Sequence, residues 1–228
     1  ADFTSRLKFM GYSDPRGSGH FSGRITWGLV AAGVIAKKIL GGTVINASLK
    51  EAGGTADIEK AVEEAMKAGD SIGGIVECII ENPPLAAGEP FFYSAESAIS
   101  QAVFSIPAIK AIEFGAGFRA ASMRGSEHND PFTDTKGTTL TNNAGGINGG
   151  ITNGNPVVFR VAVKPTSSVG VEQTTIDFST GKAVKLKAEG RHDACIALRM
   201  PVIVEAAAAV ALADLLLIDR GISGKQRS

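Results

Sequence analysis

Two long segments of the chain are apolar on every side of a predicted helix. The first covers residues 22–40, where Ser22 is a candidate N-cap and Gly41 ends the helix. The second covers residues 201–219, where Pro201 suits the first turn. A helix without a polar face is covered on every side in a folded protein. We therefore expect further layers of structure outside both helices.

Segments rich in Val, Ile and Phe are expected to form those layers. Residues 71–81 are rich in Ile and Val and end before Pro83, and residues 156–163 alternate apolar side chains around Arg160. The sequence predicts an α/β protein of the layered α+β type, in which buried apolar helices are sandwiched between antiparallel β-sheets. Residues 174–178 and 183–187 are predicted to form a hairpin, with Val184 and Leu186 facing inward. Two shorter helices are predicted, one at 57–67 and one after the N-cap Ser94.

We expect one domain over residues 1–228, with two irregular places and an unusual start. A pair of glycines leads abruptly into a predicted helix, so either the loop is short or residues are missing near 53–55. Residues 125–141 are polar and lack periodicity, which predicts a mobile loop over a site. The chain begins at Ala1 with neither Met nor a signal-peptide pattern, so we expect a fragment truncated at its amino terminus.

Composition and charge narrow the classes of function. The 23 basic and 23 acidic side chains cancel and 44% of the residues are hydrophobic, which excludes a disordered tail and argues against nucleic-acid binding. The longest apolar stretch, 202–218, is interrupted by Glu205 and Asp214, which argues against a membrane span and for a soluble protein. Cys78 and Cys195 are too few for a disulfide framework, so we expect a reducing cytoplasm. The His and Cys residues offer no zinc-ligand spacing.

The start of the first long helix is a candidate anion site. Free backbone N–H groups and the positive end of the helix dipole gather there, and a hydroxyl and a guanidinium join them, which suits a phosphate or a carboxylate. An ordinary capped helix with a solvent-facing Arg explains the pattern equally well. The residues concerned are His20, Phe21, Ser22, Gly23 and Arg24.

Two further segments could bind a ligand. The glycines of residues 141–156, Gly149 among them, would let backbone approach a planar ligand, and their place between core elements favours this over a flexible linker. After residue 163, an ammonium and three hydroxyls converge in a turn that could hold an anion, although an exposed polar turn is the simpler interpretation. This turn consists of Lys164, Pro165, Thr166, Ser167 and Ser168.

The segment 190–195 carries adjacent titratable side chains. Arg191 beside Asp193 is a candidate for a buried charge pair in which the carboxylate could move a proton, and a structural salt bridge is the alternative. His192 and Asp193 project differently, so they cannot form a serine-type triad with each other, and no Gly-x-Ser-x-Gly segment supplies a nucleophile.

Taken together, these blocks resemble the chorismate synthase family over nearly the whole chain. That family converts 5-enolpyruvylshikimate 3-phosphate to chorismate by a 1,4-elimination of phosphate, the last common step of the shikimate pathway toward the aromatic amino acids. It needs reduced FMN although the reaction has no net redox change. The resemblance rests on separate segments in one order: 22–24 with 31–38, 69–74, 88–90, 105–108, 125–127, 143–147, 164–166 and 190–193.

The resemblance implies roles for particular residues. Arg24 and Arg191 would stabilise charge on the departing phosphate and on the substrate carboxylates, and Asp193 would lie near flavin N5 and help to remove the C6 proton. The family also implies a homotetramer in the cytoplasm, with NADPH as a candidate reductant of FMN. Flavin contacts are implied for His20, Phe21, Ser22, Pro107, Ala108, Gly149, Lys164, Pro165, Thr166, Ser167, Ser168 and Arg191.

The chain departs from the family at functional positions. His20 and Phe21 stand where most relatives have Arg and Ser, and neither of the two segments that carry the family's catalytic histidines is present. Because each lost proton-transfer group costs on the order of a hundredfold in rate, we expect this chain to be inactive or nearly so. A non-catalytic flavin- or phosphate-binding module is the alternative. A glycine-rich structural protein would remain only if neither ligand bound.

Overall fold

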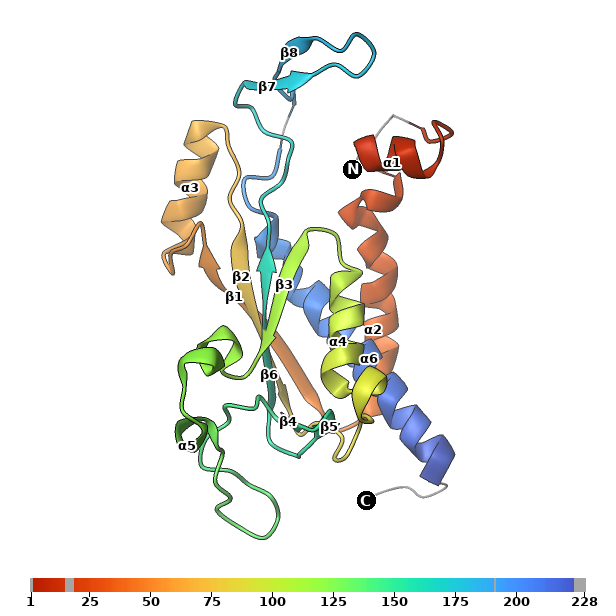
Figure 1. Cartoon of the computed structure of the whole chain (residues 1–228), viewed down its shortest axis with the longest axis vertical. Helices are drawn as coiled ribbons and strands as arrows, with labels where there is room; N and C mark the ends of the chain where they lie inside the picture. Colours follow the sequence, from red (N-terminus) through yellow and green to blue (C-terminus); the bar gives the residue numbers. More distant parts are fainter. Residues whose placement is uncertain (1, 15–18, 191, 224–228) are drawn as a thin grey trace.

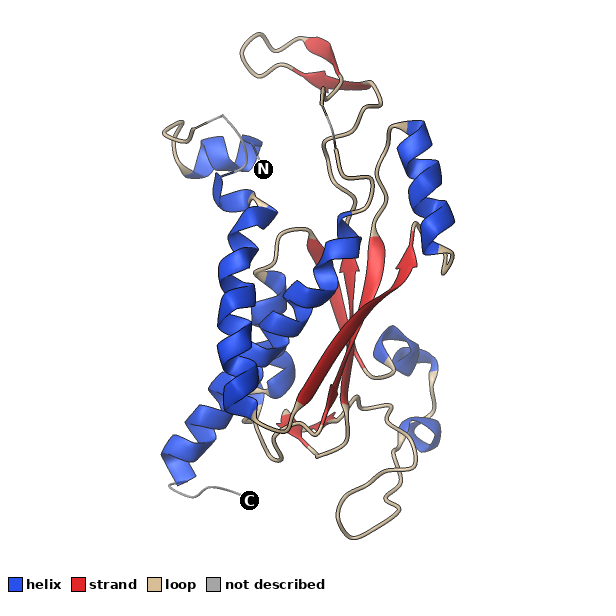
Figure 2. Cartoon of the chain, turned by 180° about the vertical axis from the view of Figure 1, so that it is seen from behind, coloured by secondary structure: helices blue, strands red, loops and turns tan. Residues whose placement is uncertain are grey.

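The computed structural model describes residues 2–14, 19–190 and 192–223. Its centre is one antiparallel sheet of four strands in the order β1-β2-β6-β3 (Figure 1). Helices α2, α4 and α6 lie together on one side of this sheet (Figure 2). The strands are β1 (Val44–Ala52), β2 (Gly74–Glu81), β6 (Val157–Val163) and β3 (Ile109–Phe114), and the three helices are α2 (Thr26–Leu40), α4 (Ala95–Phe104) and α6 (Met200–Ser223).

Smaller elements extend from this centre. Helix α3 (Ile58–Ala68) connects β1 to β2, and β7 (Gln173–Ile176) pairs with β8 (Ala183–Leu186) in a hairpin that projects from one end of the molecule (Figure 1). The remaining elements are α1 (Asp2–Lys8), α5 (Gly125–His128), β4 (Ile147–Asn148), β5 (Ile151–Thr152) and the short 3-10 helices η1 (Gly19–Phe21), η2 (Gly23–Ile25), η3 (Phe91–Tyr93), η4 (Gly117–Ser122) and η5 (Ile196–Arg199).

The alternation of β6 places the core between the sheet and the helices. Val157, Phe159 and Val161 are at most 1% exposed, whereas Arg160 points to the other face of the sheet. On β2 the Cys78 thiol lies on the buried face, and burial raises its pKa well above the ordinary value. The predicted α+β class is confirmed. The helices were expected between two sheets, but among the described residues one four-stranded sheet covers one side of them.

Helix α6 is the central helix of the core. The stretch Ile196–Gly221 has the length and the apolar composition of a membrane span, with a mean hydropathy of 2.2 over its most apolar window, so Glu205 and Asp214 do not interrupt it as the sequence argument supposed. Val204 and Leu212 are nevertheless fully buried against the other core elements. These contacts explain the apolar composition of α6 as that of a core helix.

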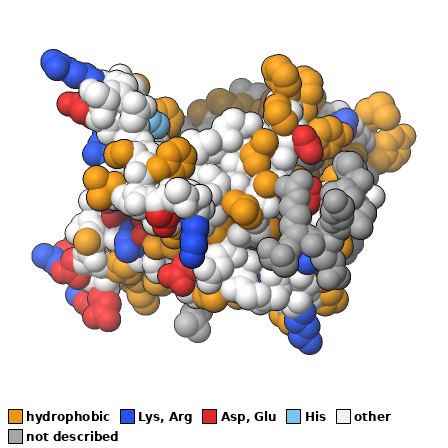
Figure 3. Space-filling model, turned by 90° about the horizontal axis from the view of Figure 1, so that it is seen from below, with side chains coloured by type: hydrophobic (Ala, Val, Ile, Leu, Met, Phe, Trp, Pro, Cys, Tyr) orange, Lys and Arg blue, Asp and Glu red, His pale blue; other side chains and the backbone are white. Residues whose placement is uncertain are grey.

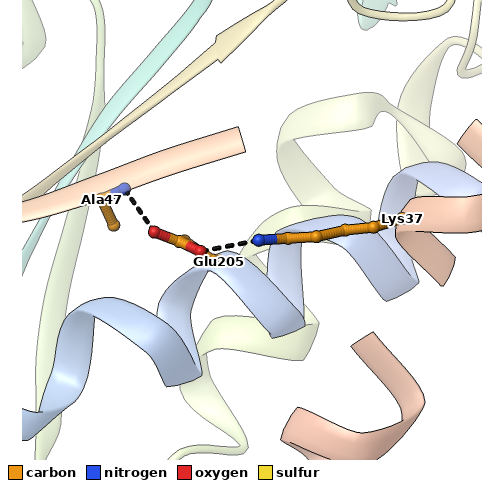
Figure 4. A network of polar contacts seen from close by, with 3 residues as sticks. All are labelled: Lys37, Ala47 and Glu205. Atoms are coloured by element: carbon orange, nitrogen blue, oxygen red, sulfur yellow. Dashed lines mark hydrogen bonds and ion pairs between the residues drawn. The ribbon is translucent and has the colours of Figure 1, made fainter. Parts of the chain in front are cut away.

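One carboxylate joins α6 to two neighbouring elements. Glu205 Oε2 lies 2.6 Å from Lys37 Nζ on α2, and Glu205 Oε1 accepts a 2.9 Å hydrogen bond from the Ala47 N–H on β1 (Figure 4). β1 is an edge strand, so no neighbouring strand accepts the hydrogen bond of this N–H group. The Glu205 carboxylate accepts it instead. Close to this contact, α2 and α6 approach with no side chain between them, since a Cβ at Gly33 would lie 2.5 Å from Ala206 Cβ.

The expectation that the first apolar helix is covered on every side is wrong for one chain. Only Thr26, Gly33, Ala36 and Leu40 of α2 are buried, and they include the positions that face α6. The opposite side of α2 is open, with Trp27 76% exposed. Helix α2 therefore retains a large apolar surface that this chain does not cover.

The predicted hairpin forms, but it lies outside the core. Val184 and Leu186, expected to face inward, are 37% and 56% exposed, because β7 and β8 pair only with each other. Between β1 and α3 the chain turns tightly, with Gly53 and Gly54 at positive φ and the Thr55 N–H donating to the Ala52 carbonyl at 3.1 Å. The connection near 53–55 is therefore short in the structure.

Candidate functional site

Three segments that are distant in the sequence meet at one end of the sheet. They precede β2, follow β6 and precede η5, and each contributes one of the family-like blocks described above. Hydrogen bonds connect the three segments to one another, so their residues form a single site. The Ser71 hydroxyl donates to the Thr166 carbonyl at 2.7 Å, the Gly170 N–H to the Gly69 carbonyl at 2.8 Å, and the Ile72 N–H to the Ala194 carbonyl at 2.8 Å.

A cavity of about 180 Å³ lies among these three segments. Ser168 comes from the segment after β6, and Gly190 and His192 come from the segment before η5. Asp70 lines the same cavity, and its carboxylate accepts a 2.7 Å hydrogen bond from the Ser71 N–H. The cavity therefore offers a hydroxyl, an imidazole and a carboxylate over a glycine-rich wall, which suits a polar ligand.

The glycines before β2 let the segments approach this closely. A Cβ at Gly73 would lie 2.4 Å from the Val163 carbonyl oxygen, and a Cβ at Gly74 would lie 2.6 Å from the Glu51 carbonyl oxygen. No side chain fits at either position unless the backbone moves. Gly73 thus fixes how near the end of β6 can approach the start of β2, and Gly74 fixes how near β1 can approach it.

Pro107 and Ala108 lie beside the turn that follows β6. The Lys164 N–H donates to the Ala108 carbonyl at 2.9 Å, so two sets of predicted flavin contacts are neighbours. Ala108 has φ of 76°, a left-handed conformation that costs energy for a residue with a Cβ. The Lys164 ammonium donates to the Pro165 carbonyl at 3.1 Å and remains exposed.

Asp193 pairs with an arginine that the sequence analysis missed. Arg199 Nη2 lies 3.0 Å from Asp193 Oδ1, and the two side chains are 73% and 42% exposed. The expected pair between Arg191 and Asp193 stays a prediction, because Arg191 lies outside the described residues, but Asp193 itself is exposed and not buried. The spacing of six residues gave no helical or strand signal for the contact with Arg199, which the 3-10 turn of η5 brings into reach.

The predicted anion site at the start of α2 is a pair of short 3-10 turns. Ser22 caps η2, since its hydroxyl accepts a 3.2 Å hydrogen bond from the Arg24 N–H, and α2 itself begins at Thr26. His20 and Phe21 lie in η1 and are exposed. Figure 1 shows the start of α2 at the same end of the molecule as the end of β6, but in the helix layer. Arg24 does not line the cavity that Ser168 lines.

Gly149 lies at the opposite end of the sheet from Lys164. It belongs to the turn between β4 and β5, and the carbonyl of its neighbour Gly150 accepts a 2.8 Å hydrogen bond from the Ala95 N–H at the start of α4. Pro107 follows the end of the same helix, about 15 Å away for ten residues at 1.5 Å each. One chain therefore does not bring Gly149 into the cavity that Ser168 lines.

Asp130 organises the glycine-rich segment and was not singled out from the sequence. Its carboxylate accepts hydrogen bonds from the Thr141 hydroxyl at 2.7 Å and from the Asn143 and Ala144 N–H groups at 2.8 Å. Burial alone would raise its pKa, but the hydrogen bonds from Ala144, Asn143 and Thr141 outweigh that effect and hold the pKa below its ordinary value. The predicted loop 125–141 thus contains the short helix α5 and a fixed carboxylate, and its mobility stays a prediction.

Comparison with known proteins identifies the family of this chain. A sequence model described as chorismate synthase matches residues 1–217. The chain belongs to the chorismate synthase family. A chorismate synthase of Chitinophaga pinensis is 60% identical over 96% of this chain and 67% of its own length. A chorismate synthase of Korarchaeum cryptofilum is 44% identical over 94% of this chain and 68% of its own length.

A solved structure supports the same family at the level of the fold. A crystal structure of chorismate synthase superposes with a TM-score of 0.69 and 28% sequence identity, covering 88% of this chain and 65% of the other. The chain thus spans about two thirds of the length of the relatives it matches. The family uses a flavin cofactor and a small-molecule substrate, and its members are biosynthetic enzymes.

Proposed function

We propose that this chain forms part of the active site of an FMN-dependent chorismate synthase. The reaction is the 1,4-elimination of phosphate from 5-enolpyruvylshikimate 3-phosphate, which gives chorismate. The observation that carries the proposal is the joining of three distant segments, 69–74, 164–170 and 190–194, around one polar cavity. Membership of the family supports the reaction, because the family model matches residues 1–217 and so includes all three segments.

The cavity fits a part of the flavin in one chain. Its volume of about 180 Å³ is below the roughly 300 Å³ at which sites for drug-sized ligands begin. Ser168 and the neighbouring N–H groups suit the phosphate or hydroxyl-bearing end of FMN, because both are hydrogen-bond donors. The wall formed around Gly69 and Gly170 carries no side chain that would exclude the ligand. Lys164, Pro165, Thr166 and Ser167 would continue this surface toward Pro107 and Ala108.

The remaining residues are proposed either to bind the charged groups of the substrate or to transfer a proton. Reduced FMN, when bound, supplies the transient electron donation that the elimination needs. Arg24 and Arg191 are proposed to hold the negative charge of the substrate, and Asp193 is proposed to receive a proton. Arg199 would hold the Asp193 carboxylate in position, because its guanidinium lies 3.0 Å from Asp193 Oδ1. His20, Phe21 and Ser22 lie beside Arg24 and are proposed as flavin contacts next to the substrate.

The family resemblance also underlies three broader proposals. The protein is proposed to act in the cytoplasm, as a homotetramer, with NADPH as the source of reducing equivalents for FMN. Gly149 lies far from Lys164 in one chain, which is consistent with a site completed by a neighbouring subunit. We further propose that the chain as given has little or no activity, because it carries neither family segment with a catalytic histidine.

Equilibrium titration with oxidised and reduced FMN tests the site. We expect saturable fluorescence quenching, weakened about fivefold to tenfold in Ser168→Ala through the loss of one hydrogen bond of about 1 kcal/mol. Ser122→Ala is the matched control, because Ser122 donates to the Arg119 carbonyl and does not line the cavity. The absence of any saturable quenching in the parent chain would remove the proposed flavin site.

A turnover assay separates the two candidate functions. With substrate and reduced FMN present, we expect chorismate, detected by its ultraviolet absorbance, to accumulate no faster than in buffer. FMN binding without turnover would support the non-catalytic flavin- or phosphate-binding module for this chain. Turnover comparable to that of the Chitinophaga pinensis relative would contradict the proposed loss of activity.

A further inference from the structure

A second cavity lies at the end of the sheet opposite to the candidate site. Its volume is about 480 Å³, within the range of roughly 300–1,000 Å³ in which small-molecule sites fall. It forms where α2 ends, β1 begins, β2 ends and α6 ends, at the lower end of the molecule in Figure 1. The eight residues of β2 separate it from the cavity that Ser168 lines by roughly 25 Å. The two cavities share no lining residue, so they are separate sites.

Apolar side chains from three parts of the chain line this second cavity. Leu40 at the end of α2 is buried, Leu216 on α6 is half-buried and Leu85 after β2 is 63% exposed. A space-filling view from below shows this end of the molecule, where exposed hydrophobic side chains lie among charged ones (Figure 3). A ligand in the cavity would therefore remove from water apolar surface that the chain leaves partly exposed.

Hydrogen bonds fix the segment after β2 that forms one wall of the cavity. The Thr43 hydroxyl donates to the Asn82 carbonyl at 2.8 Å, which joins the start of β1 to the end of β2. The Thr152 hydroxyl donates to the Pro84 carbonyl and accepts a 2.9 Å hydrogen bond from the Ala87 N–H, and Thr152 is only 1% exposed. The wall is thus formed before a ligand arrives, which lowers the entropy cost of binding.

A guanidinium and an amide at this cavity are suited to bind a carboxylate. Leu216 and Arg220 are four residues apart on α6, so they lie on one face of the helix. The Arg220 guanidinium makes neither an ion pair nor a hydrogen bond with any described residue, and the same holds for the side-chain amide of Asn82. Both groups carry N–H donors, and a guanidinium binds a carboxylate through two parallel hydrogen bonds.

The negative charge at this cavity is suited to bind an ammonium. Asp219 lines the cavity beside Arg220, and its carboxylate can accept several hydrogen bonds, so it can bind an ammonium in addition to its contact within the chain. Helices α2 and α6 both end at the cavity, and the carboxyl-terminal end of a helix carries partial negative charge and unpaired carbonyls. With one side chain of each charge in the lining, a zwitterion fits better than an anion or a cation.

We propose that this cavity binds an α-amino acid with a large apolar side chain. Arg220 and Asn82 bind its carboxylate, Asp219 binds its ammonium, and its side chain lies among the leucines of the cavity. The two charged groups of an α-amino acid are attached to one carbon atom, which matches opposite charges on adjacent residues of α6. Because the cavity is separate from the candidate flavin site, the inference does not rest on the proposed function.

Isothermal titration calorimetry of the chain with three probes tests the inference without any substitution. L-phenylalanine carries both charged groups, 3-phenylpropanoate lacks the ammonium, and 2-phenylethylamine lacks the carboxylate. We expect saturable binding of one L-phenylalanine per chain, with each analogue bound at least about tenfold more weakly because it leaves one charged group without its partner. The absence of saturable binding, or an analogue that binds as tightly as L-phenylalanine, would overturn the inference.

Two charge-removing variants assign each charged group of the ligand to its partner. Arg220→Met should weaken L-phenylalanine binding at least about tenfold and leave the affinity for 2-phenylethylamine unchanged, because that probe has no carboxylate to lose. Asp219→Asn should weaken L-phenylalanine binding by a similar factor and leave the affinity for 3-phenylpropanoate undiminished. A loss of folding would instead weaken all three probes alike. Variants that bind L-phenylalanine as the parent does would refute the assignment.

A blocking variant and a matched control test whether the ligand lies in this cavity. Leu85→Trp should abolish L-phenylalanine binding by filling the cavity, and the exposed position lets the chain fold, as circular dichroism would show. Arg119→Met removes an exposed guanidinium on η4 that lines neither of the two cavities, so it should bind L-phenylalanine as the parent does. Undiminished binding in Leu85→Trp, or competition between L-phenylalanine and FMN, would place the ligand elsewhere and overturn the inference.

Discussion

The carboxylate of Glu205 lies 2.6 Å from the ammonium of Lys37, and the same carboxylate accepts the N–H of Ala47 at 2.9 Å. One side chain thereby fixes α2, α6 and the edge strand β1 relative to one another. Both charged side chains are partly buried, with 38% of Lys37 and 21% of Glu205 exposed, so losing this pair should cost more stability than losing a fully exposed pair.

Glu205→Ala is expected to lower the free energy of unfolding by about 2–3 kcal/mol. The variant leaves a backbone N–H group unpaired at the sheet edge and a Lys without its partner. Lys37→Met should cost less, about 1 kcal/mol, because the carboxylate keeps the Ala47 N–H. Urea unfolding followed by circular dichroism measures both. Equal losses in the two variants would show that the strand contact contributes nothing.

Replacement of two glycines of α2 by alanine should change the stability of the chain in opposite directions. A Cβ at Gly33 would lie 2.5 Å from Ala206 Cβ, so Gly33→Ala should push α2 from α6 and destabilise by about 1–3 kcal/mol. At Gly28 nothing lies within 4 Å, so Gly28→Ala should stabilise by about 0.5–1 kcal/mol through helix propensity. Thermal unfolding of the pair provides the comparison. A Gly33→Ala chain as stable as the parent would contradict the close helix contact.

Asp130 should make stability depend on pH at the acid end. Because hydrogen bonds hold its folded-state pKa below the ordinary value, its stabilising effect is present above that ordinary value and is lost as pH falls through the folded-state pKa. Asp130→Asn should therefore be less stable than the parent at about pH 7, and the difference should shrink toward about pH 3. Urea unfolding at both pH values measures it. Glu64→Gln is the control, because Glu64 is exposed on α3 and lies outside the segment that Asp130 holds.

The two thiols should be inert in the folded chain. Cys78 and Cys195 are 0% and 5% exposed, and burial raises the pKa of Cys78, so little thiolate is present to react. We expect both thiols to resist an aromatic disulfide reagent in buffer and both to react in denaturant. Rapid labelling of Cys78 in the native chain would show that the core between β2 and α6 opens readily.

The features that depend on a local sequence pattern could be predicted from the sequence. The alternation of residues 156–163 was enough to predict β6. The apolar run after Ser22 was enough to predict α2, but Ser22 caps the 3-10 turn η2 and α2 begins at Thr26. Strand β1 was missed because Val44–Ala52 mixes small, polar and charged residues, as an edge strand with one solvent-facing side does. The open side of α2 was missed because an apolar pattern indicates that a surface is covered. It does not indicate whether the same chain or another one covers it.

The candidate site was less predictable because it depends on long-range contacts. The blocks around Ser71, Thr166 and Ala194 were recognised singly, but their meeting depends on the antiparallel order of the sheet. Arg199 and Asp130 act through side-chain contacts across turns, for which no sequence period exists. The separation of Gly149 from Lys164 follows from the length of the sheet, which sequence spacing does not convey.

The hydrogen bonds that join the three segments of the site all end on main-chain carbonyl oxygens, and two of them also begin on main-chain N–H groups. The shape of the cavity is consequently set by the course of the polypeptide, with little help from the identity of its side chains. Evolutionary drift could replace most of the lining without altering that shape, provided that Gly73 and Gly74 are kept. Selection on this region should therefore act on backbone geometry first and on lining chemistry second.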